Sequence, residues 1–186
     1  MRIVSGLLKG KKVEFLKSST TRPLRDFVKE NIFNIINHSN LINIKIEKAN
    51  VLDLYSGIGS FGIECVSRGA KSVTFIENNN KALTILKKNI NNLKIEKQSE
   101  VFNEKTTSFF SKKKNIEKFD IIFFDPPFAE NFFTDELEII KSSVIYKKKH
   151  LIVIHREISS KDKLDKIIKI ILTRDYGRSK IIFGTF

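Results

Sequence analysis

The chain has 186 residues, of which 41% are hydrophobic and 30% charged, and its formal net charge is +13. These proportions are typical of a globular domain with a sizeable core and exclude an intrinsically disordered chain. Its single cysteine excludes an internal disulfide framework, and no apolar run approaches the ~20 residues of a membrane helix. We therefore expect a cytoplasmic protein without a membrane partner. The positive charge suggests a polyanion such as nucleic acid, although AT-rich coding also enriches lysine.

Residues 1–45 are predicted to form an N-terminal arm. Residues 1–17 alternate in polarity around Gly6 and Gly10, which indicates a short β-hairpin with glycine in its turn. Pro23 suits the first turn of a helix, and apolar residues then recur at helical spacing. The arm carries the basic side chains that we expect to bind nucleic acid through its phosphates, namely Lys9, Lys11, Lys12, Arg22 and Arg25.

Residues 46–186 alternate between short apolar runs and helical patterns. Such repeats predict an α/β domain with a mostly parallel sheet, helices on both faces and ligands at the carboxyl ends of the strands. The last two runs, 167–175 and 179–185, predict an antiparallel hairpin that closes the sheet. The other predicted strands are 51–55, 72–77, one near 101–102, 119–124 and 151–154, and the predicted helices are 60–68, 79–91, 106–113 and 135–142.

A glycine-rich loop follows the first of these strands. The run 57–62, Gly-Ile-Gly-Ser-Phe-Gly, matches G-x-G-x-x-G between a strand and a helix, where a ligand can approach the backbone and free N–H groups closely. Asp53 ends the strand, where its carboxylate can face a cationic amino-acid group but would repel a pyrophosphate. This favours S-adenosylmethionine over a dinucleotide. Glu77 ends the second strand and suits the ribose hydroxyls of either cofactor. The candidate cofactor-binding residues are Asp53, Tyr55, Gly57, Gly59, Gly62, Glu77 and Asn78.

A second motif, Asp125-Pro126-Pro127-Phe128, ends the strand 119–124. Two prolines lack N–H donors and fix φ, so they stop the strand in a rigid turn. The Asp125 carboxylate and the Pro126 carbonyl could hold the hydrogens of an amino group, aiming its lone pair at a methyl donor. Phe128 could stack on a nucleobase. We therefore regard these four residues as catalytic. The three histidines are scattered, and we predict no metal site.

These motifs resemble the bacterial small-subunit rRNA guanine-N2 methyltransferases of the RsmD type, within the class I methyltransferases. The match covers nearly the whole chain, and its N-terminal elements are the most specific part. They are Arg2-Ile3-Val4-Ser5-Gly6, Lys9-Gly10-Lys11-Lys12, and Arg22-Pro23 with Val28-Lys29-Glu30. The glycine loop, the Asp125–Phe128 turn and Tyr176-Gly177-Arg178 are also similar to the family's motifs.

The resemblance implies a Rossmann-like class I methyltransferase fold with S-adenosylmethionine as cofactor. It implies a guanine amine of 16S rRNA as acceptor, either in naked RNA or in a small ribosomal subunit assembly particle, and we expect a monomer. Three segments depart from the family. Leu24-Arg25 replaces a Thr-rich stretch after Arg22-Pro23. Where many relatives carry an acidic residue for the adenine amine, this chain has Asn103-Glu104-Lys105-Thr106, in which Lys105 cannot accept that hydrogen bond but Glu104 or a backbone carbonyl could. His155-Arg156-Glu157 replaces another acidic pattern and is left without a role.

Other functions stay open at this point. Methylation of DNA adenine at N6, or of protein glutamine at N5, would use a similar turn. Those families usually carry an additional domain, for which 186 residues leave no room. A nicotinamide-dependent enzyme is disfavoured by Asp53 and by the Asp125 turn. A non-catalytic RNA-binding protein with this fold would have no need of an intact carboxylate and intact glycines.

Overall fold

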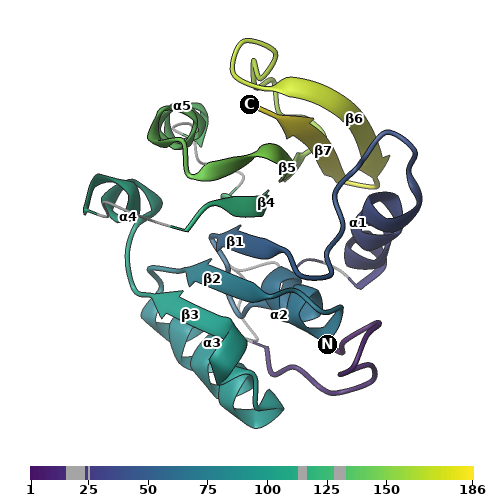
Figure 1. Cartoon of the computed structure of the whole chain (residues 1–186), viewed down its shortest axis with the longest axis vertical. Coiled ribbons are helices and arrows are strands. Elements are labelled where there is room, and N and C mark those ends of the chain that lie inside the picture. Colours follow the sequence, from purple (N-terminus) through teal and green to yellow (C-terminus); the bar gives the residue numbers. More distant parts are fainter. Residues whose placement is uncertain (16–23, 25, 113–116, 128–132) are drawn as a thin grey trace.

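The computed structural model describes residues 1–15, 24, 26–112, 117–127 and 133–186. These residues form a seven-stranded sheet in the order β3-β2-β1-β4-β5-β7-β6 (Figure 1). The first five strands in that order are parallel, whereas β7 is antiparallel to both β5 and β6. The predicted fold class is therefore confirmed. The strands are β1 (Asn50–Leu54), β2 (Ser72–Ile76), β3 (Ser99–Phe102), β4 (Phe119–Phe124), β5 (Tyr146–Glu157), β6 (Lys169–Tyr176) and β7 (Ser179–Thr185).

Helices cover both faces of the sheet (Figure 1). Successive side chains of β4 point to opposite faces of the sheet, and both faces are apolar. Ile121 and Phe123 belong to one apolar core, and Ile122 and Phe124 belong to the other, so each face needs a covering layer. The first core holds α1 (Asp26–His38), α2 (Ser60–Ser67) and α3 (Asn80–Leu93). The second core holds α4 (Thr106–Lys112) and α5 (Phe133–Ser143), and a short 3₁₀ turn, Glu96–Gln98, precedes β3.

The N-terminal segment packs along α2. Its predicted hairpin reduces to a single antiparallel bridge between Arg2 and Lys12, although the chain does reverse at Gly6 and Gly10, which have φ of 83° and 82°. The N–H of Leu7 donates to the Ser67 carbonyl at the end of α2 instead of to a second strand. Backbone N–H groups that could have extended the hairpin therefore donate to acceptors on helix α2 instead.

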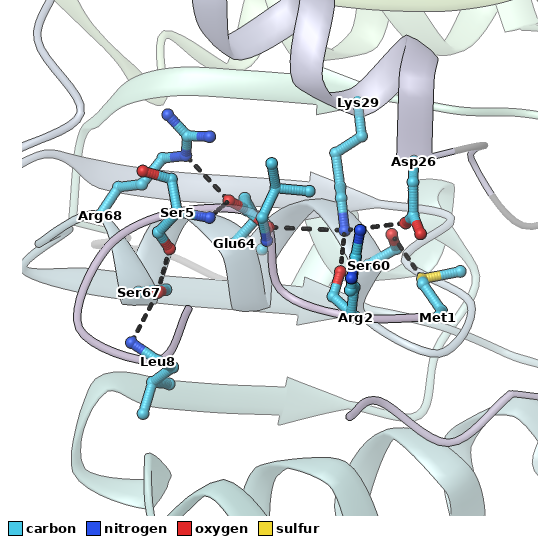
Figure 2. Close-up of polar contacts among 12 residues, drawn as sticks. Met1, Arg2, Ser5, Leu8, Asp26, Lys29, Ser60, Glu64, Ser67 and Arg68 are labelled. Atoms are coloured by element: carbon cyan, nitrogen blue, oxygen red, sulfur yellow. Dashed lines mark hydrogen bonds and ion pairs between the residues drawn. The ribbon is translucent and has the colours of Figure 1, made fainter. Parts of the chain in front are cut away.

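A buried carboxylate anchors this segment (Figure 2). Glu64 of α2 is fully buried, and its two oxygens accept the N–H groups of Val4 and Ser5, each at 2.9 Å. Arg68 donates to Oε1 at 3.0 Å, and the Lys29 ammonium, which is 1% exposed, lies 3.5 Å from Oε2. Glu64 and its two basic partners, the Glu64 cluster, thus join α1, α2 and the N-terminal segment.

Two elements differ in extent from their predicted bounds. Helix α1 begins at Asp26, and Pro23 lies outside the described residues. Strand β5 has twelve residues, far more than the apolar run at 151–154 that predicted it. It is longer because Lys147 pairs with Asp120 of β4 at 2.8 Å and because β7 pairs with β5 as far as Glu157.

No helix in the described part of the chain is both long enough and apolar enough to span a bilayer.

Removing the Glu64 carboxylate would leave the buried Lys29 ammonium with only the half-exposed Asp26 as its counter-charge, and the N–H groups of Val4 and Ser5 without their acceptor. Because a buried charge that loses its buried partner is costly, we expect Glu64→Ala to lower the free energy of unfolding by about 3–5 kcal/mol, measured by urea denaturation. Glu117→Ala is the matched control, since its 2.9 Å pair with Lys71 is exposed and worth about 0–1 kcal/mol. Equal losses in the two variants would contradict the role of the Glu64 cluster.

Candidate active site

The two motifs meet at the carboxyl ends of β1 and β4. These neighbouring strands are in parallel register, with Leu54 opposite Phe124. The strand order runs outward from this pair, to β2 and β3 on one side and to β5 on the other. Such a switch point leaves a crevice between the loops that follow the two central strands, and ligands of α/β sheets bind there. The glycine loop after β1 and the proline turn after β4 therefore border the same crevice.

Asp53 caps helix α2 from the neighbouring strand. The residue before α2, Gly59, has no side chain with which to cap the helix, and Oδ2 of Asp53 accepts the N–H of Gly62 at 2.9 Å. The other oxygen, Oδ1, is buried without a hydrogen-bond partner in the described structure. Burial raises the pKa of Asp53, the charges of Asp125 and Glu77 raise it further, and the Gly62 N–H acts in the opposite direction.

Glu77 fixes the glycine loop. Its Oε2 accepts the N–H of Gly57 and its Oε1 accepts the N–H of Asn79, both at 2.7 Å. The glycines differ in what surrounds them: a Cβ on Gly57, whose φ is 56°, would meet open space, whereas one on Gly62 would lie 2.3 Å from the Phe75 ring. Gly62 thus permits close packing of α2 on β2, and the backbone at Gly57 is open to approach.

The other two predicted cofactor residues have different settings. Tyr55 has a positive φ of 56°, and its hydroxyl donates to Oε2 of Glu136 on α5 at 2.6 Å. Its side chain is therefore engaged with the second face of the sheet. Asn78 is exposed beyond the end of β2, directly after Glu77. The three acidic residues at this edge, Asp53, Glu77 and Asp125, are close enough for the last two to raise the pKa of the first.

The proline turn is attached to β5. The side chain of Asp125 is 23% exposed, and its Oδ1 lies 2.8 Å from Nδ1 of His155. Arg156 donates from Nη1 to the Pro127 carbonyl at 3.2 Å. Pro126 is buried and Pro127 exposed. The predicted stacking residue, Phe128, lies outside the described residues.

Sequence reasoning missed the part played by His155 and Arg156. Both were noticed only as a departure from the family pattern, and both contact the turn in the structure. The prediction that 151–154 is a strand of a parallel sheet was a usable signal for these contacts. The carboxyl ends of neighbouring parallel strands meet at one edge, so residues 155 and 156 could be expected near the turn that follows 119–124. The order of the strands, which was needed to use that signal, is not written in the local pattern.

The predicted RNA-binding lysines lie on the segment that packs on α2. Lys9, Lys11 and Lys12 are exposed, so their assignment stays a prediction. Arg22 and Arg25 lie outside the described residues. Among the residues that are described, no group of three or more His, Cys, Asp or Glu side chains is arranged to hold a metal ion.

The chain matches one protein family over almost all of its length. A family model described as conserved hypothetical protein 95 matches residues 1–185. The ribosomal RNA small subunit methyltransferase D of Haemophilus influenzae is 36% identical over 164 residues, which cover 88% of this chain and 80% of that protein. The protein of the same name from Buchnera aphidicola subsp. Baizongia pistaciae is 34% identical over 168 residues, with coverage of 90% and 80%.

Solved structures agree with the sequence matches. An Escherichia coli protein assigned as a methyltransferase superposes with a TM-score of 0.84 at 25% identity, covering 100% of this chain and 97% of that one. A Haemophilus influenzae protein assigned as a methylase gives a TM-score of 0.79 at 28% identity, covering 99% and 97%. The chain therefore belongs to the ribosomal RNA small subunit methyltransferase D family, the RsmD type, and is a class I methyltransferase with S-adenosylmethionine as its cofactor.

Proposed function

We propose that this chain transfers a methyl group to the exocyclic N2 amine of a guanine in 16S rRNA, in the cytoplasm and as a monomer. The observation that carries the proposal is the Asp125 carboxylate, partly exposed at the end of β4 beside the glycine loop of β1. The relatives named above act on small-subunit rRNA by name. The net charge of +13 suits an RNA substrate, either naked or within an assembling subunit.

The residues at the edge of β1 and β2 fit S-adenosylmethionine. The buried Oδ1 of Asp53 lacks a hydrogen-bond partner and could accept from the cationic amino-acid part of the cofactor. Glu77 already accepts two N–H groups, but each carboxylate oxygen retains a lone pair for a ribose hydroxyl. The open space at Gly57 allows a ligand to lie against the backbone. When bound, the cofactor supplies an electrophilic methyl group on a sulfonium, and the neutral thioether that remains after transfer is a good leaving group.

The turn after β4 would prepare the acceptor. The lone pair of a guanine amine is delocalised into the ring, so the amine is a poor nucleophile. Hydrogen bonds from this amine to Asp125 and to the Pro126 carbonyl would orient it and favour a tetrahedral nitrogen. The nitrogen gains the methyl group and loses one proton, for which the Asp125 carboxylate is the adjacent acceptor. The other contribution is proximity, because the turn is rigid and borders the same crevice as the glycine loop.

An aromatic pair of one exposed and one half-buried ring marks where RNA would lie. Phe27 at the start of α1 is 65% exposed, and its ring meets that of Tyr176 edge-on at 5.9 Å. Tyr176 ends β6 beside α1 (Figure 1). Since Ser179 pairs with Glu157 at the end of β5, the turn between β6 and β7 lies at the same edge as Asp125. The exposed Phe27 ring, and the exposed Arg174 and Arg178 on either side of Tyr176 in the chain, suit an unstacked base. The target guanine must leave its stack to react.

Asp125 is the first residue to test. Tritiated-methyl transfer from S-adenosylmethionine is measured on rRNA and on small ribosomal particles that lack the modification. We expect label as N2-methylguanine, and kcat lower by about 10²-fold or more in Asp125→Asn, which keeps the shape but not the charge. Glu96→Gln, an exposed change in the turn before β3, is the control. Label on adenine or on a protein glutamine instead would reject the guanine assignment.

Asp53→Asn tests the cofactor site without measuring turnover. A carboxyl whose pKa is higher in the folded than in the unfolded state binds more protons when folded, so wild-type stability falls as pH rises through that interval. We expect Asp53→Asn to lack this component and to gain stability relative to wild type between acidic and neutral pH. It should also bind S-adenosylhomocysteine about 10- to 100-fold more weakly by calorimetry, the loss of one charge-assisted hydrogen bond. Unchanged affinity would remove Asp53 from the site.

Tyr176→Ala and Phe27→Ala test the RNA surface. Stacking on a base is worth about 1–3 kcal/mol, so we expect each variant to raise KM for rRNA roughly 5- to 100-fold. The value of kcat and the affinity for S-adenosylhomocysteine should be unchanged. Leu41→Ala removes a side chain that is 61% exposed beyond the other end of α1 and is the control. An equal change in KM in the control would show that the aromatic pair has no special role.

A further inference from the structure

Register places His155 beside Asp125. Strands β4 and β5 pair in parallel with Phe124 opposite Ile154, so the next residues along each strand are neighbours on the same face. His155 is 7% exposed, and its Nδ1 lies 2.8 Å from Oδ1 of Asp125. Its other ring nitrogen, Nε2, lies 2.9 Å from the hydroxyl of Ser179 on β7. The imidazole therefore bridges the proline turn and the closing hairpin.

These two contacts select one tautomer of the neutral ring. An ionised carboxylate only accepts hydrogen bonds, so Nδ1 must carry the hydrogen and Nε2 must accept from the Ser179 hydroxyl. His150 has the same arrangement, because its Nδ1 lies 2.8 Å from the Lys147 carbonyl and its Nε2 accepts the N–H of Phe186 at 2.9 Å. His150 thus provides an internal reference for this tautomer.

Arg156 holds the backbone of the same turn. Its guanidinium donates to the Pro127 carbonyl at 3.2 Å, pairs through Nε with Asp162 at 3.0 Å, and lies over the Phe133 ring at 4.2 Å. The arginine is 3% exposed. Because the backbone is fixed in this way and φ is set by the prolines, the main remaining freedom near Asp125 is the rotation of its own side chain.

We propose that His155 is a positioning residue that holds Asp125 in the rotamer needed for the reaction. It occupies Oδ1 and leaves Oδ2, which contacts no donor among the described residues, to accept from the acceptor amine. His155 touches no reacting atom in this arrangement. The inference rests on the proposed function, since it assigns Asp125 the contact with the amine. Loss of His155 would then lower kcat while KM for rRNA and for S-adenosylmethionine stays unchanged.

Two conservative variants separate positioning from a purely structural role. The amide nitrogen of Asn can replace Nδ1 and donate to Asp125, whereas that of Gln reaches the place of Nε2 beside Ser179. We expect His155→Asn to retain a kcat close to that of wild type. His155→Gln and His155→Ala should lose about 10- to 100-fold in kcat, as for a displaced catalytic group. Equal kcat in all three variants, or a loss confined to KM or to stability, would overturn the proposal.

A spectroscopic measurement on the intact chain keeps this test separate from that of the proposed function. Nitrogen-15 NMR of the imidazoles should show the Nδ1–H tautomer for both His155 and His150 in the wild type. In Asp125→Ala, His155 should shift towards the Nε2–H tautomer while His150 is unchanged. An Nε2–H form of His155 in the wild type would refute the proposal. If instead the tautomers are as expected but the wild type methylates no rRNA, the proposed function fails and the Asp125–His155 contact stands.

Discussion

The parallel pairing of β1 with β4 is the constraint on which the site depends. Leu54 and Phe124 are 124 − 54 = 70 positions apart in the sequence, and the register places them side by side. Everything that follows either strand is thereby brought to one edge, with the glycine loop on one side and the proline turn on the other. A shift of this register would separate Asp53 from Asp125 even if both loops kept their local shape.

That arrangement gathers three carboxylates in a small volume. Burial disfavours the charged form of Asp53 and raises its pKa, and the charges of Asp125 and Glu77 raise that pKa further. The chain offsets part of this cost with backbone donors, because Gly62 donates to Asp53, and Gly57 and Asn79 donate to Glu77. The remaining electrostatic strain favours a ligand that carries positive charge, which is the character of a sulfonium with an ammonium group.

Charged groups in the interior hold the elements that surround this edge of the sheet. Away from the crevice, the buried Glu64 accepts two N–H groups of the N-terminal segment and pairs with Lys29 of α1. At the crevice, β5 holds the turn through His155 and Arg156. Both arrangements use charged groups in the interior, where each needs a specific partner, so they fix geometry as well as adding stability. The loops of a candidate active site need a defined geometry more than a hydrophobic core does.

The sequence by itself determined the class of fold, the glycine loop and the turn at Asp125, because each depends on residues close together in the chain: apolar periodicity, three glycines and two prolines. It also singled out Asp53 and Glu77 as candidate cofactor residues by their places at strand ends. Only the tertiary structure decided what meets across strands. The pairing of His155 with Asp125 and the engagement of Tyr55 by Glu136 both join elements whose neighbourhood is set by strand order and register. Local patterns carry no record of that order, since it follows from how the whole sheet buries its two faces.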